Sequence, residues 1–136
     1  MTRRRGIVAV LAGLGALIVA VPGLASAQPR YVGVVIGYGA AGLPQATSSV
    51  GASAQEASQG ALLKCHERLA TCALAATSTQ CIGVAIGFGT KWMDAEGPDR
   101  RSAEANARAR LAEMASDMSS DIPELPPVIS SSCASD

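Results

Sequence analysis

An internal repeat constrains this chain more than any other feature of its sequence. The segment VGVVIGYG at residues 32–39 matches IGVAIGFG at residues 82–89, each position being identical or exchanging one apolar or aromatic residue for another. The stretch Ser53-Ala54-Gln55-Glu56 is echoed by Ser102-Ala103-Glu104, again about 50 residues later. Two copies are too few for a solenoid, so the repeat predicts one pseudo-symmetric domain with halves at about 31–80 and 81–133.

Each half is expected to contain a strand, a loop, a helix and a short third strand. The two matching segments are rich in β-branched residues, which is typical of buried strands. A loop is predicted over 40–51, and Ser53 with Glu56 predicts a capped helix start. The second helix is expected near Ser102, and the third strands over 72–76 and 128–132. The predicted fold class is α+β: two pseudo-symmetric strand-helix-strand repeats form one small antiparallel sheet, packed by two helices and stapled by disulfides.

Residues 1–27 have the pattern of an export signal. Three arginines at positions 3–5 precede an apolar run over residues 6–21, and Ala25-Ser26-Ala27 is a small-x-small cleavage site. The apolar run is shorter than the roughly 20 residues that a membrane-spanning helix needs. We therefore expect a cleaved signal peptide, one domain over residues 28–136, and a secreted or extracytoplasmic location without stable membrane insertion.

The cysteine count agrees with export. All four cysteines follow the expected cleavage site, at Cys65, Cys72, Cys81 and Cys133. An even number of cysteines in a small exported domain indicates two disulfides. The tight C-x-x-C pairs that zinc sites favour are absent from the sequence, so no metal site is predicted.

Four cysteines allow three pairings, and the repeat favours one of them. Met114 and Asp121 stand where the second half would echo Cys65 and Cys72. The joint absence of two cysteines indicates a bonded pair, because the loss of one partner leaves a free thiol in an oxidising compartment. We therefore predict Cys65–Cys72 and, between equivalent positions of the two halves, Cys81–Cys133. The alternative, Cys72–Cys81 with Cys65–Cys133, would staple a hairpin.

Charge and composition disfavour nucleic acid as a partner. After removal of residues 1–27, 8 basic side chains face 11 acidic ones, which leaves a net charge of about −3. The chain has 1 Trp, 2 Tyr and 1 Phe, too few for a surface that stacks bases. This charge balance also leaves no excess of basic residues to bind a phosphate backbone.

The motifs that resemble chemical sites have simpler interpretations. Residues 37–42, GYGAAG, match the G-x-G-x-x-G pattern of dinucleotide loops, but Leu43-Pro44 follows in place of the required helix, so no cofactor is predicted. His66 is the only histidine and lies near a helix end, and no G-x-S-x-G elbow accompanies it. The carboxylates of Asp94 and Glu96 are interpreted as part of a polar turn, and those of Glu113 and Asp117 as a solvated helix face. No catalytic residue is predicted.

The order of these features resembles the DUF4189 domain family of small exported bacterial proteins. The resemblance covers roughly Tyr31 to Cys133. It rests on the glycine-bearing strands, an alanine-rich helix ending near Cys65, then Cys72 and Cys81, Trp92 and a second alanine-rich helix. Tyr31-Val32-Gly33 replaces the usual Trp-Gly opening, and the second half lacks the fuller cysteine set. The family implies an exported, disulfide-bonded domain and no known activity.

The function expected from these features is that of an extracellular or envelope binding module. Its partner would be a protein or a cell-envelope component, contacted through Tyr38, Phe88 and Trp92, since aromatic residues are enriched at interface anchors. The alternative for these aromatic residues is packing in the core at the sheet edge. The alternatives are a small secreted enzyme or enzyme inhibitor, and a purely structural envelope protein. An exposed aromatic patch favours the binding module, whereas a concave pocket that gathers titratable side chains favours an enzyme.

The export signal yields the first testable prediction. Mass spectrometry of the secreted protein should find a chain that begins at Gln28, because signal peptidase cleaves after the small residue that closes the Ala25-Ser26-Ala27 site. Recovery of the chain from the membrane fraction with residues 1–27 still attached would contradict this prediction.

Overall fold

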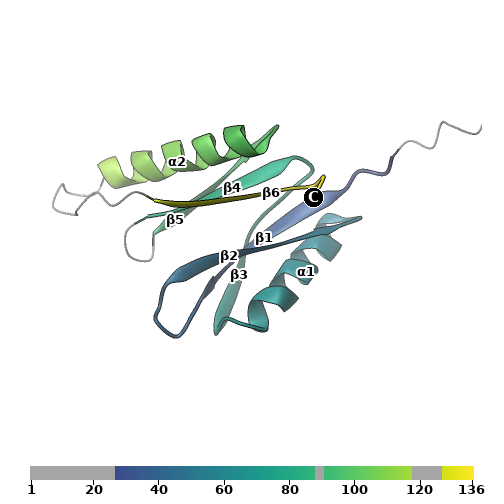
Figure 1. The fold of residues 1–136 in the computed structure, drawn as a ribbon, viewed down its shortest axis with the longest axis horizontal. Coiled ribbons are helices and arrows are strands. Elements are labelled where there is room, and N and C mark those ends of the chain that lie inside the picture. The colour runs from purple at the N-terminus through teal and green to yellow at the C-terminus, as the bar shows by residue number, and fades with distance from the viewer. Residues whose placement is uncertain (1–26, 88–90, 118–126) are drawn as a thin grey trace, which may run out of the picture.

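The computed structural model describes residues 27–87, 91–117 and 127–136, which form a helix, two sheets and a second helix in successive layers (Figure 1). The two sheets are antiparallel and three-stranded, with strand orders β2-β1-β3 and β5-β4-β6. In these ranges neither helix is long and apolar enough to cross a membrane. In chain order the elements are β1 (Tyr31–Tyr38), β2 (Pro44–Gly51), α1 (Ala54–His66), β3 (Thr71–Ser78), β4 (Cys81–Ile86), β5 (Trp92–Gly97), α2 (Arg100–Ser116) and β6 (Val128–Cys133).

The predicted α+β class is correct, but the prediction of one sheet is wrong. The segment expected to be a loop over 40–51 contains β2, which pairs with β1 along its whole length, from Tyr31↔Gly51 to Tyr38↔Pro44. The polar turn expected around residue 94 belongs to β5. Both are edge strands, which tolerate polar side chains and a proline at the first position. Each half therefore builds its own sheet.

The helix starts agree with the sequence in one half and differ in the other. Ser53 caps α1 as predicted, since its Oγ accepts the N–H of Glu56 at 3.1 Å. The cap of α2 is Asp99, whose carboxylate accepts the N–H of Ser102 at 2.8 Å. The predicted start near Ser102 is therefore late, because an aspartate caps a helix as well as a serine does.

Each helix lies directly on the backbone of its central strand. A Cβ atom added at Gly33 of β1 would lie 2.7 Å from the main chain of Ala57, and one added at Gly83 of β4 would overlap the main chain of Ala103. Both alanines are completely buried. Glycine on the strand and alanine on the helix are thus what allows this close approach.

The opposite faces of the same two strands form the core between the sheets. Because side chains alternate along a strand, residues two apart share a face. The buried cluster between the sheets contains Val32, Val34 and Ile36 of β1, with Ile82 and Val84 of β4. The central strands are consequently buried on both faces, which explains their continuous apolar sequence.

The structure has disulfides between Cys65 and Cys72 and between Cys81 and Cys133, the pairs that were predicted. The predicted placement of the second bond is wrong, however. Cys81 and Cys133 are direct partners on β4 and β6 of the same sheet, so this bond does not join the two halves. Each disulfide instead ties the last strand of its half to another element of that half.

The echo of Cys65 at Met114 stays a prediction. A Cβ atom added at Gly37 would meet Cys65, and one added at the matching Gly87 would meet Leu111. The nearest atoms at Gly87 all belong to Leu111, whereas those at Gly37 belong to Cys65, Leu69 and Thr71. Asp121, the predicted echo of Cys72, lies outside the described residues.

The loop lengths of the two disulfides generate a stability prediction. The cysteines are separated by 7 and 52 residues. Chain-entropy arithmetic gives about 2.5 kcal/mol for the shorter loop and about 4 kcal/mol for the longer one. The Cys81→Ala/Cys133→Ala double variant should therefore lose more unfolding free energy than the matched Cys65→Ala/Cys72→Ala variant. Urea unfolding without reductant measures both losses, and an equal or reversed order would contradict the prediction.

Candidate functional site

Two of the three predicted interaction residues meet at one end of the sheet sandwich. Tyr38 ends β1 and Trp92 begins β5, and the Trp92 Nε1–H donates a hydrogen bond to the Tyr38 hydroxyl at 3.2 Å. Both side chains are half-buried against the core between the sheets. They therefore bridge the two sheets rather than form a freely exposed aromatic patch. Phe88 lies outside the described residues.

The G-x-G-x-x-G match covers the end of β1 and the hairpin turn that follows it. Gly42 N–H donates to the carbonyl of Gly39 at 2.9 Å, and Gly42 has a φ of 71°, which favours glycine. The chain then returns as β2 along β1. A dinucleotide loop requires a strand followed by a helix. These residues instead connect two strands.

The remaining candidate for acid–base chemistry is His66, which is exposed at the end of α1. In the described part of the chain, no three His, Cys, Asp or Glu side chains are grouped so that they could hold a metal ion.

Four strands lie at sheet edges, and helix side chains cover the main chain of three of them. The ammonium of Lys64 on α1 donates to the carbonyl of Ser48 on β2 at 3.2 Å. The guanidinium of Arg100 on α2 donates to the carbonyl of Ser131 on β6 at 2.7 Å. A charged side chain over an edge carbonyl obstructs the approach of another strand.

β5 is covered in the same way by two side chains of α2. The guanidinium of Arg110 donates to the carbonyl of Asp94 at 2.7 Å. The amide of Asn106 donates to the carbonyl of Glu96 at 2.9 Å. The edges β2, β5 and β6 thus each give a main-chain acceptor to their own helix.

β3 is the edge strand that differs. Its sequence, TCALAATS, contains no charged residue and no proline, as is also true of β6, so the difference lies in what covers its main chain. Within residues 27–87, 91–117 and 127–136, no side chain of a helix bonds to its main chain. Leu74 is 48% exposed, and the neighbouring Ala73 is exposed as well. A bulge near Leu74 interrupts the register with β1. This edge is the candidate functional site.

A shallow hollow adjoins the β3 edge. Ala76 of β3 lines it together with Asp94 and Glu96 of β5, and with Asn106 and Arg110 of α2. Asp94 and Glu96 are predicted to lie in a polar turn, and this prediction is wrong because both belong to β5. They lie two residues apart on one strand, opposite Val84 and Ile82, and therefore on the face that looks towards the first sheet.

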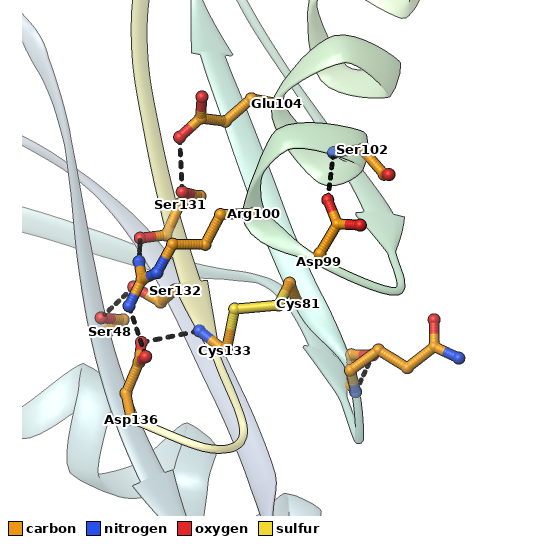
Figure 2. Close-up of a disulfide and its surroundings, with 12 residues drawn as sticks. Ser48, Cys81, Asp99, Arg100, Ser102, Glu104, Ser131, Ser132, Cys133 and Asp136 are labelled. Atoms are coloured by element: carbon orange, nitrogen blue, oxygen red, sulfur yellow. Dashed lines mark hydrogen bonds and ion pairs between the residues drawn. A yellow bond between two sulfur atoms is a disulfide. The ribbon is translucent and has the colours of Figure 1, made fainter.

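The C-terminal residues are held to the second sheet by a small polar network (Figure 2). The Asp136 carboxylate accepts the N–H of Cys133 at 2.7 Å and forms an ion pair with Arg100. The hydrogen bond from Cys133 lowers the pKa of Asp136; partial burial opposes this effect and Arg100 adds to it. At the start of α2 the hydrogen bonds from Ser102 lower the pKa of Asp99 in the same direction.

A second set of hydroxyl contacts joins β6 to its surroundings. Ser131 Oγ donates to the Glu104 carboxylate of α2 at 2.6 Å. Ser132 Oγ donates to Ser48 Oγ of β2 at 2.7 Å, which links the two sheets on the side opposite β3 and β5 (Figure 2). A hydroxyl contact thus joins the β2 and β6 edges, and the hollow described above lies on the opposite side, where β3 and β5 meet.

Comparisons with protein families, with curated proteins and with solved structures give no match for this chain.

The Asp136 network predicts a pH dependence of stability. Because the folded-state pKa of Asp136 is below its ordinary value of 3.8, its carboxylate stabilises the fold above that pH. This stabilisation should disappear as the pH falls through the lowered pKa. Asp136→Asn should therefore lower the unfolding free energy at pH 7, by no more than about 1 kcal/mol because the ion pair is partly exposed. Urea unfolding from pH 7 downwards should show the two proteins converge in acid, and equal stability at pH 7 would contradict the prediction.

Proposed function

We propose that this chain is an exported interaction module that binds an extended segment of another protein as an additional strand along β3. In this mode the main-chain groups of an exposed edge supply affinity, and alternate side chains supply specificity. The observation that carries the proposal is the contrast between β3, whose main chain accepts no helix side chain in the described residues, and the other three edges, each of which accepts at least one.

The chemistry of the β3 edge supports strand addition. An edge strand presents unpaired N–H and C=O groups, and proteins usually protect such edges with charges, proline or covering side chains. β3 has a bulge as its only such device among the described residues, and Leu74 adds an exposed apolar contact. An arriving strand would find both hydrogen-bonding groups and apolar surface.

The proposed compartment agrees with the covalent structure. Both disulfides persist in oxidising compartments, which supports the export signal in residues 1–27. The resemblance to the DUF4189 family supports the same location. The pseudo-symmetric repeat is part of the proposal, with each half as one copy of a strand-strand-helix-strand unit, supported by their shared element order.

The bridge between Tyr38 and Trp92 has a supporting role in this proposal. Its hydrogen bond fixes β1 of the first sheet to β5 of the second. The bridge thereby ties the sheet that contains β3 to the sheet whose strand β5 lines the hollow.

A peptide-binding experiment tests the proposal. The secreted protein is immobilised, and linear peptides that bind it are selected from a displayed library. The affinity of the enriched peptides is then measured by fluorescence anisotropy. Leu74→Lys and Leu74→Asp should each weaken binding about tenfold or more, since a charge of either sign on the edge opposes strand pairing. The matched controls Leu63→Lys and Leu63→Asp alter a leucine that is 68% exposed on α1 and should leave the affinity unchanged.

Amide hydrogen exchange provides a second readout of the same experiment. Bound peptide should slow exchange in β3 more than in β2, β5 or β6. The proposal fails if no peptide is enriched, or if the Leu74 and Leu63 variants bind the enriched peptides equally well.

A further inference from the structure

We infer that the strand accepted by β3 is basic, with lysine or arginine at alternate positions that pair with Asp94 and Glu96. This inference rests on the proposed strand addition and identifies the chemistry of the partner. The juxtaposition that carries it is the position of two carboxylates beside the open edge, in the hollow that Ala76 of β3 also lines.

The position of the hollow determines which side chains of an added strand would reach it. A new strand lies about 4.8 Å outside β3, and every second side chain points to one face of the extended sheet. On the face towards the second sheet, these side chains would lie over the hollow, because Ala76 shares that face with Val34 and borders Asp94 and Glu96. The other side chains would lie on the face that carries Leu74 and α1.

The spacing of the two carboxylates matches that of an extended strand. Asp94 and Glu96 are two residues apart on one face of β5. Side chains on one face of a strand recur about every 6.6 Å, so two basic residues separated by one residue have the same spacing. A Lys-x-Lys or Arg-x-Arg segment can therefore place one cation near each carboxylate.

The two carboxylates are free to accept a new partner. In the described part of the chain, neither carboxylate makes a hydrogen bond or an ion pair with a side chain. Arg110 also lines the hollow, but its guanidinium donates to the main-chain carbonyl of Asp94. Two carboxylates and one guanidinium leave a net negative charge in the hollow, which favours cationic side chains.

The same charges disfavour a second copy of this chain as the occupant. Antiparallel pairing of two β3 strands about a two-fold axis would place the same surface of both copies side by side. The Asp94 and Glu96 pairs of the two copies would then approach each other, and such like-charge contacts oppose association. The net charge of about −3 expected after removal of residues 1–27 adds to the repulsion between copies and to the attraction of a basic partner.

Two labelled peptides test the inference on the secreted protein. One is an eight-residue peptide that alternates lysine and valine, and the other carries glutamate in place of each lysine. Fluorescence anisotropy at low salt should show the lysine peptide binding at least about tenfold more tightly than the glutamate peptide. Raising the salt concentration should reduce this preference, because the pairs lie in an open hollow where ions screen them.

Matched charge variants identify the residues responsible. Asp94→Asn/Glu96→Gln should abolish the preference for the lysine peptide. The control Glu113→Gln/Asp117→Asn removes the same charge from exposed residues at the far end of α2 and should retain the preference. An unchanged preference in the Asp94/Glu96 variant would overturn the inference.

The Leu74 variants separate this inference from the proposed function. If Leu74→Lys and Leu74→Asp both weaken peptide binding but the Asp94/Glu96 variant does not, strand addition stands and the charge specificity is wrong. If none of these variants alters binding, both fail. A dimer in sedimentation experiments that dissociates on Leu74→Lys would make a second copy the occupant and would also overturn the inference.

Discussion

Burial of β1 and β4 on both faces is the constraint on which the rest of this structure depends. One face of each strand meets a helix at Gly33 or Gly83, and the other meets the opposite sheet. The helix faces must therefore be built from small residues, because any side chain on these glycines would overlap the helix backbone. With both central strands enclosed, contact with other molecules falls to the edge strands and the outer helix surfaces.

The disulfides add to the stability that the small apolar core provides. In the described residues, the largest fully buried side chains are those of isoleucine and valine. The free energy of folding gained from apolar burial is therefore modest for each residue. In each half the last strand returns to its sheet after a helix, which makes its docking entropically expensive. Cys72 fixes β3 to the end of α1, and Cys133 fixes β6 to β4. The covalent bonds thus hold the strands whose return involves the longest chain segments.

The sequence revealed what depends on local pattern and missed what depends on long-range pairing. The apolar runs of β1 and β4 and the Ser53 cap are local signals, and their predictions are confirmed. β2 and β5 carry serines and carboxylates that read as loop or turn, and their pairing with a central strand is not visible in the sequence. The hydrogen bond between Trp92 and Tyr38, 54 residues apart, is likewise a long-range contact that the sequence does not reveal. The predicted disulfide pairs are confirmed, but Cys81 and Cys133 are brought together by the register of β4 and β6 within one sheet, which the sequence does not reveal.

The uncovered edge of β3 affects both self-association and the binding of partners. An uncovered apolar edge exposes a protein to pairing with its own copies, and charged residues placed nearby reduce that risk. Asp94 and Glu96 stand beside the β3 edge, where they oppose a second acidic chain without covering the β3 main chain. Charges placed on β3 itself would also protect the edge but would oppose pairing with partner strands in general. Carboxylates on the neighbouring strand leave the backbone of β3 available and make access depend on the charge of the arriving strand.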